Sequence, residues 1–275
     1  MNPSIAFIGG GNMASSLIGG MLAAGTPPES ILVAEPSDDQ RQNLSQQFGI
    51  NTSANNLDVL TYDVVVLAVK PQVLQVVCRE LANAEDAAGP LYVSIAAGIR
   101  SNSIERWLGG NAAIVRCMPN TPALLQCGAT ALYANTAVTE EQSKQAEDIL
   151  QAAGITTWVD DETLLDAATA LSGSGPAYFF LLMEAMQTAG IELGLDSDTA
   201  KQLSLQTALG AARMAHESDV SPAELRARVT SKGGTTAAAL ASFEANGFYE
   251  IVSEALRAAY NRSAELAEEL GQDNE

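Results

Sequence analysis

IAFIGGGNMA, at residues 5–14, is the stretch that decides the fold of this chain. A short apolar run precedes Gly9, Gly11 and Ala14 in the spacing G-x-G-x-x-A, and a helix-like pattern follows. Such glycines allow a tight turn and a close approach of pyrophosphate to the backbone, while the small third residue lets helix and strand pack closely. A plain strand–helix turn is the alternative. The position between a strand and a helix, with a second strand-like run ending at Glu35, favours dinucleotide binding.

Strand-like and helix-like runs alternate around and after this turn. The expected strands are residues 5–8, 31–35, 64–69, 91–95, 114–118, 129–133 and 155–159. Several are continuous Val, Ile and Leu runs, which are typical of a parallel sheet buried on both faces. Helix-like stretches such as 13–24, 72–82 and 140–153 separate most of them. The pattern predicts a doubly wound α/β domain, Rossmann-like with a mostly parallel sheet, over residues 1–162.

The second part of the chain, residues 163–275, shows no convincing strand. Its composition favours helix throughout. We expect one helix from Pro176, as its first residue, to Gly194, and others at residues 197–216, 222–228, 236–245 and 248–270. Residues 271–275 are expected to fray. The sequence therefore predicts an all-α domain, whose surplus apolar faces favour association between copies of the chain.

Composition limits the classes of partner. The chain of 275 residues is 47% hydrophobic, enough for a substantial core. It has 33 acidic and 14 basic residues, a formal charge of −19, which argues against nucleic acid or an anionic membrane as a partner. We see neither a leader-like start nor an apolar run of about 18 residues, so a cytoplasmic protein without a membrane span is expected. The three cysteines are too few and too irregularly spaced for a metal site, and we expect them in the core.

A second glycine turn lies near the other end, in LRARVTSKGGTTAAAL at residues 225–240. The first N–H groups of a helix have no intrahelical partner and lie at the positive end of its dipole. Such a turn can hold a carboxylate or a phosphate. Ordinary capping by Thr235 or Thr236 is the alternative. The pairing with the first glycine turn favours an anion site.

Four further segments lie at expected strand ends or helix starts, where a doubly wound sheet places its ligands. They are AVKP at 68–71, SIAAG at 94–98, RCMPNTPA at 116–123 and SGSGPAY at 172–178. Lys70 is either a cation near the cofactor or a surface lysine. Asn120 lies in a rigid polar turn between two prolines, which is either a site or a loop.

The chain lacks obvious acid–base residues for reducing a ketone. Its single histidine is His216, and no Tyr-x-x-x-Lys pair occurs. A carbonyl reductase usually needs an acid to protonate the developing alkoxide. An imine can arrive already protonated, so hydride addition develops no negative charge. The sequence therefore favours imine reduction.

In their order along the chain, these motifs resemble pyrroline-5-carboxylate reductase. The segment from Pro222 to Leu240 matches the signature P-x-x-L-x-x-x-V-T-S-x-G-G-x-T-x-x-A-L, although Lys232 stands where members usually carry proline. The resemblance implies NAD(P)H-dependent reduction of 1-pyrroline-5-carboxylate to proline. It also implies a homodimer through the C-terminal helices, often built into a ring of dimers.

Candidate site residues follow from the resemblance and from the turns above. Ser231 and Thr236 are candidate catalytic residues, with Thr236 as a proton relay, and the substrate would contact Ser231, Gly233, Gly234, Thr235 and Thr236. The candidate cofactor-binding residues are Gly9, Gly10, Gly11, Asn12, Met13, Ala14, Glu35, Asn55, Ala68, Val69, Lys70, Pro71, Ala96, Ala97, Gly98 and Asn120. No metal is expected.

The choice between NADPH and NADH stays open at this stage. Glu35 is placed to accept hydrogen bonds from a ribose 2′-hydroxyl, which favours NADH. A 2′-phosphate would be repelled unless Glu35 points away and Ser37 or Arg41 reaches it. The resemblance favours NADPH instead.

Two other classes of function compete with this interpretation. A related imine or β-hydroxyacid reductase would share the layout, but the hydroxyacid enzymes need a lysine in the helix after SGSGPAY, which FFLLMEAMQTAG lacks. A dinucleotide-sensing regulatory protein would keep GGGNMA without needing the late turn.

Overall fold

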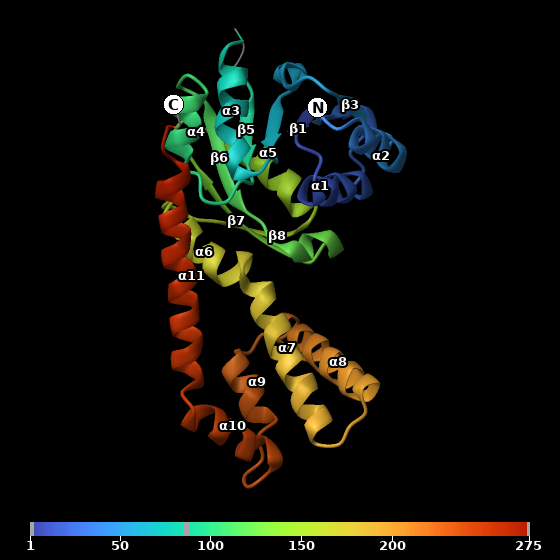
Figure 1. The fold of residues 1–275 in the computed structure, drawn as a ribbon, viewed down its shortest axis with the longest axis vertical. Coiled ribbons are helices and arrows are strands. Elements are labelled where there is room, and N and C mark those ends of the chain that lie inside the picture. Colours follow the sequence, from blue (N-terminus) through green and yellow to red (C-terminus); the bar gives the residue numbers. More distant parts are fainter. Residues whose placement is uncertain (1–2, 85–88, 274–275) are drawn as a thin grey trace. The chain divides into compact units, whose positions relative to one another are not determined.

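The computed structural model describes residues 3–84 and 89–273 (Figure 1). Contacts divide the chain into two compact units, one of Met1–Ser174 with Ala259–Glu275, the other of Gly175–Ala258. The second unit is shorter than the helical domain predicted at 163–275, because residues up to Ser174 and from Ala259 onward fall in the first unit.

The first unit contains an eight-stranded sheet in the order β3-β2-β1-β4-β5-β6-β7-β8. Its neighbouring strands are parallel except for β6 and β7. The strands are β1 (Ile5–Ile8), β2 (Ile31–Ala34), β3 (Asn51–Ser53), β4 (Val64–Leu67), β5 (Leu91–Ser94), β6 (Ala113–Met118), β7 (Gly128–Ala134) and β8 (Gly154–Trp158). The mostly parallel sheet and all seven predicted strands are confirmed. The sequence reading missed β3, a short polar strand at the edge.

The strand order creates a topological switch point beside β1. Ile5 pairs with Ile31 of β2 on one side and with Val64 of β4 on the other. The chain thus leaves β1 in one direction through β2 and β3, and then returns to its other side. In open α/β sheets, ligands bind at the carboxyl ends of the strands at such a point.

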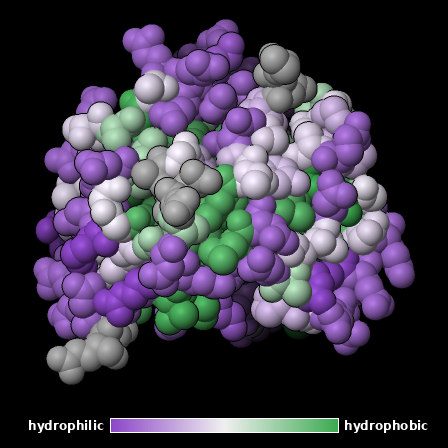
Figure 2. Space-filling model, turned by 90° about the horizontal axis from the view of Figure 1, so that it is seen from above, coloured by the Kyte–Doolittle hydropathy of each residue, from purple (hydrophilic) through white to green (hydrophobic). Residues whose placement is uncertain are grey.

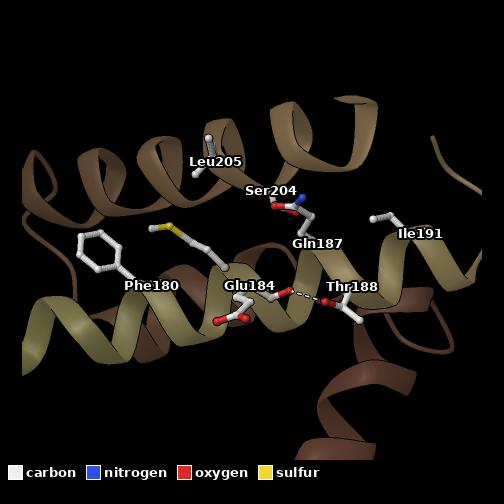
Figure 3. A pocket seen from close by; sticks show the side chains of 8 residues that line it. Phe180, Glu184, Gln187, Thr188, Ile191, Ser204 and Leu205 are labelled. Carbon is white, nitrogen blue, oxygen red and sulfur yellow. Dashed lines mark hydrogen bonds between the residues drawn. The ribbon is translucent and has the colours of Figure 1, made fainter. Parts of the chain in front are cut away.

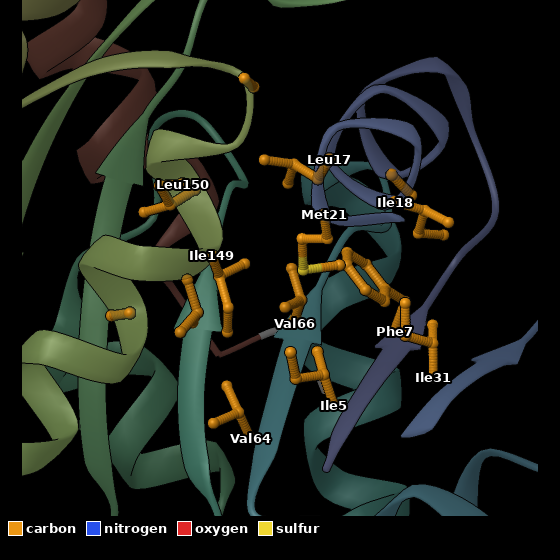
Figure 4. Packing of buried hydrophobic residues seen from close by; sticks show 14 of the residues in the cluster. Ile5, Phe7, Leu17, Ile18, Met21, Ile31, Val64, Val66, Ile149 and Leu150 are labelled. Carbon is orange, nitrogen blue, oxygen red and sulfur yellow. The ribbon is translucent and has the colours of Figure 1, made fainter. Parts of the chain in front are cut away.

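Helices cover both faces of this sheet and make a core on each. The α-helices that lie wholly in the first unit are α1 (Asn12–Ala23), α2 (Asp38–Phe48), α3 (Pro71–Ala82), α4 (Ser101–Trp107), α5 (Glu140–Gln151) and α6 (Leu164–Ala168). Because strand side chains alternate, Ile5 and Phe7 lie in one core cluster and Ala6 and Ile8 in the other. Figure 4 shows the first cluster, in which side chains from α1 and α5 lie over Phe7 and the β4 valines.

Short helices of other types connect the main elements. Three are 3₁₀ helices, η1 (Pro28–Ser30), η2 (Asn56–Thr61) and η3 (Thr121–Leu125), and one is a π-helix, η4 (Thr169–Gly173). Single π-turns inside helical segments are frequent at functional sites. This one ends on Ser172 and Gly173, the first two residues of the SGSGPAY segment.

The C-terminal end of the chain packs on the first unit. Ser263 and Ala267 of the last helix are buried. The Asp273 carboxylate accepts a hydrogen bond from Trp107 Nε1 at 2.7 Å, and the carbonyl of Gly271 accepts one from Ser103 Oγ at 3.2 Å. The expectation that 271–275 fray is therefore wrong for 271–273, and the last two residues lie outside the described part.

The second unit is helical, as predicted. It holds α7 (Gly175–Glu192), α8 (Ser197–His216), α9 (Pro222–Arg228), α10 (Thr235–Ala245) and the start of α11 (Phe248–Leu270). Pro176 is the second residue of α7 rather than the first. Gly194, with φ +104°, follows the end of that helix. Side chains of Asp196 and Ser221 cap α8 and α9.

Apolar side chains are exposed on the second unit. Phe179, Phe180 and Leu181 of α7 are each more than three-fifths exposed. Within the described residues, no helix combines the length and apolar character needed to cross a membrane. The face drawn in Figure 2 is mostly hydrophilic, with hydrophobic residues gathered in small areas between hydrophilic ones.

Candidate functional site

The first glycine turn lies at the switch point, pressed against the end of β4. Gly9 has φ +96°, and a Cβ built on it would lie 2.7 Å from the carbonyl oxygen of Ala68. Its N–H donates to the carbonyl of Ala34 at 2.8 Å. Only glycine satisfies both the backbone conformation and the contact. The structure therefore brings Gly9 together with the AVKP segment, as expected.

Helix α1 begins directly behind this turn with its first N–H groups open. Gly11 is the N-cap residue, no side chain caps the helix, and its first turn holds no acidic residue. A Cβ on Gly11 would meet nothing within 4 Å. Asn12 is exposed, whereas Ala14 is buried against the sheet. An open, positively polarised helix end behind a bare glycine fits a pyrophosphate.

Gly10 is held from the side of β2 and α2. A Cβ there would lie 2.5 Å from Leu44 Cδ1. The Gly10 N–H donates to Glu35 Oε2 at 3.0 Å, and its carbonyl accepts a hydrogen bond from Gln40 Nε2 at 2.6 Å. Sequence reasoning missed Gln40. Its position three residues after the N-cap Ser37 indicates only a role in the first turn of α2.

Glu35 follows β2, as predicted, and its carboxylate points to the glycine turn. Besides Gly10, it accepts a hydrogen bond from the Ser37 N–H at 3.1 Å. The Arg41 guanidinium donates to the carbonyl of Glu35 at 2.6 Å and pairs with Asp38. The Ser37 hydroxyl accepts a hydrogen bond from the N–H of Gln40.

Further residues expected near the cofactor lie in two places, the turn between β4 and α3 and the turn before η2. Val69 lies beside Gly9, exposed Lys70 is the N-cap residue of α3, and Pro71 is its first residue. Asn55 is exposed, and its amide bonds the N–H of Leu57 and the carboxylate of Asp58. That amide is thus committed to the local turn at the start of η2.

The SIAAG and RCMPNTPA turns are tied to their neighbours. Gly98 has φ +73°, and a Cβ there would lie 3.3 Å from Leu266 Cβ of α11. Asn120 Oδ1 accepts from the Ala129 N–H at 2.9 Å, and its Nδ2 donates to the carbonyl of Ser172 at 3.1 Å. Asn120 therefore joins β7 to the π-helix. Ala96 is buried and Ala97 is partly buried.

A buried ion-pair network supports the same end of the sheet, and sequence reasoning missed it. Arg116 of β6 donates to Glu162 at 2.7 Å, and the same carboxylate accepts from the N–H and hydroxyl of Ser101. Arg100 pairs with Asp166 at 2.7 Å. Burial lowers the pKa of Arg116, and Glu162 opposes that effect. A charged residue inside the apolar run AIVRCM is the available sequence signal.

The late glycine turn lies in the second unit and is exposed. Gly233 has φ +74°, and the Gly234 N–H closes the turn on the carbonyl of Ser231 at 3.1 Å. Gly234 is the N-cap residue of α10, with no side-chain cap and no acidic residue in the first turn. Capping by Thr235 or Thr236 is therefore wrong. Thr235 is the first helical residue, so the first N–H groups of α10 stay open to an anion.

The single histidine and the three cysteines belong to neither glycine turn. His216 is exposed at the end of α8, and of the three cysteines, Cys127 is exposed rather than in the core. A groove between α7 and α8 is lined by residues such as Phe180, Gln187 and Leu205 (Figure 3). None of the candidate site residues lines that groove.

Comparisons with known proteins cover both units. A family model described as pyrroline-5-carboxylate reductase dimerisation matches residues 162–266, and one described as NADP oxidoreductase coenzyme F420-dependent matches residues 4–98. The pyrroline-5-carboxylate reductase of Pseudomonas aeruginosa is 57% identical over 98% of this chain and 99% of its own. That of Haemophilus influenzae is 46% identical over 95% and 97%.

Solved structures agree with this assignment. A pyrroline-5-carboxylate reductase from Coxiella burnetii has a TM-score of 0.93 and 45% identity, covering 97% of this chain and 99% of that one. A Plasmodium falciparum pyrroline carboxylate reductase with NADP bound has a TM-score of 0.84 and 32% identity, covering 97% and 98%. On the strength of these full-length matches, this chain belongs to the pyrroline-5-carboxylate reductase family.

Proposed function

We propose that the chain catalyses the NAD(P)H-dependent reduction of 1-pyrroline-5-carboxylate to L-proline, the last step of proline synthesis. The observation that carries the proposal is the pair of open helix N-termini, at α1 and α10. Each follows a glycine turn and lacks a side-chain cap and acidic residues in its first turn. One anion site suits the cofactor pyrophosphate, and the other suits the substrate carboxylate.

The residues of the first unit fit a dinucleotide. Gly11 leaves open space over the start of α1, where the first N–H groups would bind the pyrophosphate. The turns after β1 and β4 touch at Gly9 and Ala68, so their backbones are fixed before any ligand binds. When bound, the reduced nicotinamide supplies a hydride to the imine carbon of the substrate.

The late turn supplies the groups that would hold the substrate. Ser231, Thr235 and Thr236 present hydroxyls, and the backbone N–H groups of the first turn of α10 have no intrahelical partner. A Cβ on Gly233 would meet nothing within 4 Å, so this part of the turn is open to a ligand. We assign carboxylate binding to this set, with Thr236 as the relay of a proton at the ring nitrogen. Charge-assisted hydrogen bonds to a carboxylate are roughly twice as strong as neutral ones.

The chemistry asks little further of the protein. A protonated imine accepts hydride without developing negative charge, so no strong acid is needed beside the reacting carbon. His216, the last residue of α8, is exposed, which agrees with a reaction that does not use a histidine.

The active form is proposed to be a cytoplasmic homodimer through the C-terminal helices, assembled further into a ring of dimers. The dimerisation family match supports association through this part of the chain. So do the exposed apolar side chains of α7 and α8, including Phe179, Leu181 and Leu209. A second copy would remove these surfaces from water.

The proposed reaction is tested by mixing protein and NADPH or NADH with three compounds in parallel. These are 1-pyrroline-5-carboxylate, a cyclic imine without a carboxylate, and a 2-keto acid. We expect rapid loss of the absorbance of the reduced cofactor with the first compound alone. Equal rates with the second compound would identify a general imine reductase, and turnover of the third a hydroxyacid enzyme. No turnover of any would favour a dinucleotide sensor.

A further inference from the structure

An acidic rim surrounds the end of β2, beside the predicted dinucleotide turn. It consists of Glu35, half-buried, and of Asp38 and Asp39 in the first turn of α2. The Glu35 carboxylate is held in place by the N–H groups of Gly10 and Ser37, at 3.0 and 3.1 Å. Its position is therefore fixed by backbone rather than by a flexible partner.

We expect a carboxylate in this place to face the adenosine ribose of a bound dinucleotide. In sheets of this type the pyrophosphate lies at the start of the first helix, and an acidic residue at the end of the second strand accepts hydrogen bonds from the ribose hydroxyls. In NADPH, a phosphate with about two negative charges replaces the 2′-hydroxyl. It would remove a hydrogen-bond donor and bring like charges together.

Arg41 is the cation that could offset this repulsion, and its guanidinium is already engaged. It donates to the carbonyl of Glu35 at 2.6 Å and forms an ion pair with Asp38. Its side chain is 17% exposed, while that of Asp38 is 80% exposed. To reach a 2′-phosphate, Arg41 would have to leave both partners, and Asp38 would remain nearby.

We propose that this chain prefers NADH to NADPH, with Glu35 as the specificity-determining residue and the Asp38–Arg41 pair as its support. This inference rests on the dinucleotide site of the proposed function and names which of its two cofactors binds more tightly. The preference comes from the acidic rim, not from the glycine turn, which would bind the pyrophosphate of either cofactor.

Calorimetric titration with NADH and with NADPH, in the absence of substrate, tests the proposal by affinity instead of turnover. We expect a Kd for NADH at least about tenfold below that for NADPH, because the ribose hydrogen bonds to a charged acceptor are lost and repulsion is added. Equal affinities, or tighter binding of NADPH, would overturn it. A failed reductase assay would leave this result unaffected, since no reaction is measured.

Two variants test which residues cause the preference for NADH, and a third, with the same change of charge, is their control. Glu35→Gln keeps an acceptor for the Gly10 N–H but removes the charge, so NADH should bind more weakly and NADPH more tightly. Asp38→Asn releases Arg41 and should tighten NADPH alone. Asp39→Asn makes the same change of charge at a neighbouring exposed residue with no ion pair in the described part of the chain.

The outcomes separate cleanly. A shift of the NADPH-to-NADH ratio by about tenfold in Glu35→Gln, and a smaller one in Asp38→Asn that exceeds that in Asp39→Asn, supports the assignment. If Asp39→Asn matches Asp38→Asn, the effect is net charge and the role of the Asp38–Arg41 pair is wrong. If Glu35→Gln, with an unchanged melting temperature, leaves the ratio as it was, Glu35 does not determine specificity.

Discussion

Both glycine turns precede a helix start without a side-chain cap, but one turn is packed against other elements and the other is exposed. The turn before α1 is enclosed, since Gly9 presses on β4 and Gly10 on Leu44. The turn before α10 is exposed, and the nearest atoms to a Cβ on Gly234 belong to Ser231, three residues earlier.

This difference separates the two tasks. The enclosed turn is held rigidly by the sheet, as suits a large cofactor that is bound along several strand ends. The exposed turn is shaped only by its own residues, so substitutions there should alter binding without unfolding the protein. Four predictions test the comparison, from the largest expected effect to the smallest.

Gly9→Ala should cost the most stability. The left-handed backbone costs alanine about 1–2 kcal/mol, and the collision with Ala68 adds about 1–3 kcal/mol. Gly25→Ala is the matched control, because Gly25 has the same φ of +96° and nothing within 4 Å of a Cβ. Chemical denaturation should show a clearly larger loss for Gly9→Ala. Equal losses would mean that the contact with β4 contributes nothing.

Ser231→Ala and Thr236→Ala should each raise KM for 1-pyrroline-5-carboxylate or lower kcat, with cofactor affinity near normal. Losing a hydrogen bond to a charged ligand costs about 1.5–3 kcal/mol, or about 10- to 100-fold in kcat/KM. Thr230→Val is the control, since the Thr230 hydroxyl bonds the carbonyl of Arg226. Unchanged kcat and KM in both variants would remove these residues from the site.

Gly11→Ala should weaken cofactor binding by about tenfold without a loss of stability, because one charged hydrogen bond to pyrophosphate is worth about that much. Its backbone, φ −72° and ψ −174°, suits alanine, and a Cβ there meets nothing in the protein. The methyl group would occupy the approach to the start of α1. Titration with NADH checks the weaker binding, and thermal unfolding checks the unchanged stability. A stability loss with normal affinity would contradict the open-site interpretation.

Lys232→Pro should have the smallest effect, a gain in stability of about 0.4–1 kcal/mol. Lys232 is the second residue of the turn closed by Gly234 and Ser231, and Gly233 in the third place has positive φ. Proline is common at the second place of such turns because it pre-sets φ. Denaturation of the variant checks the sign. A loss of stability would show that Lys232 has another backbone role.

Sequence alone predicted the sheet well because its central strands are continuous apolar runs. It missed β3, since NTS at an edge has neither apolar character nor alternation. The capping alternative placed the N-cap at Thr235 or Thr236 rather than at Gly234, because hydroxyl residues usually cap better than glycine.

The long-range hydrogen bonds and ion pairs around the site could not be predicted from the sequence. Gln40 and Gly10 are 30 residues apart, and Arg116 and Glu162 are 46 apart. Neither pairing has a local pattern, because the fold alone brings these residues together. The position of Glu35 after the second strand could be predicted from the sequence, but the hydrogen bond that its carboxylate accepts from the Gly10 N–H could not.

The most direct test of the central claim compares two substrates in two proteins. The wild type and Ser231→Ala are each assayed, at saturating NADH, with 1-pyrroline-5-carboxylate and with the same cyclic imine lacking its carboxylate. If the late turn binds the carboxylate, Ser231→Ala lowers kcat/KM for 1-pyrroline-5-carboxylate by about tenfold or more and leaves the already low kcat/KM for the other imine nearly unchanged. An equal fall for both substrates would contradict the account.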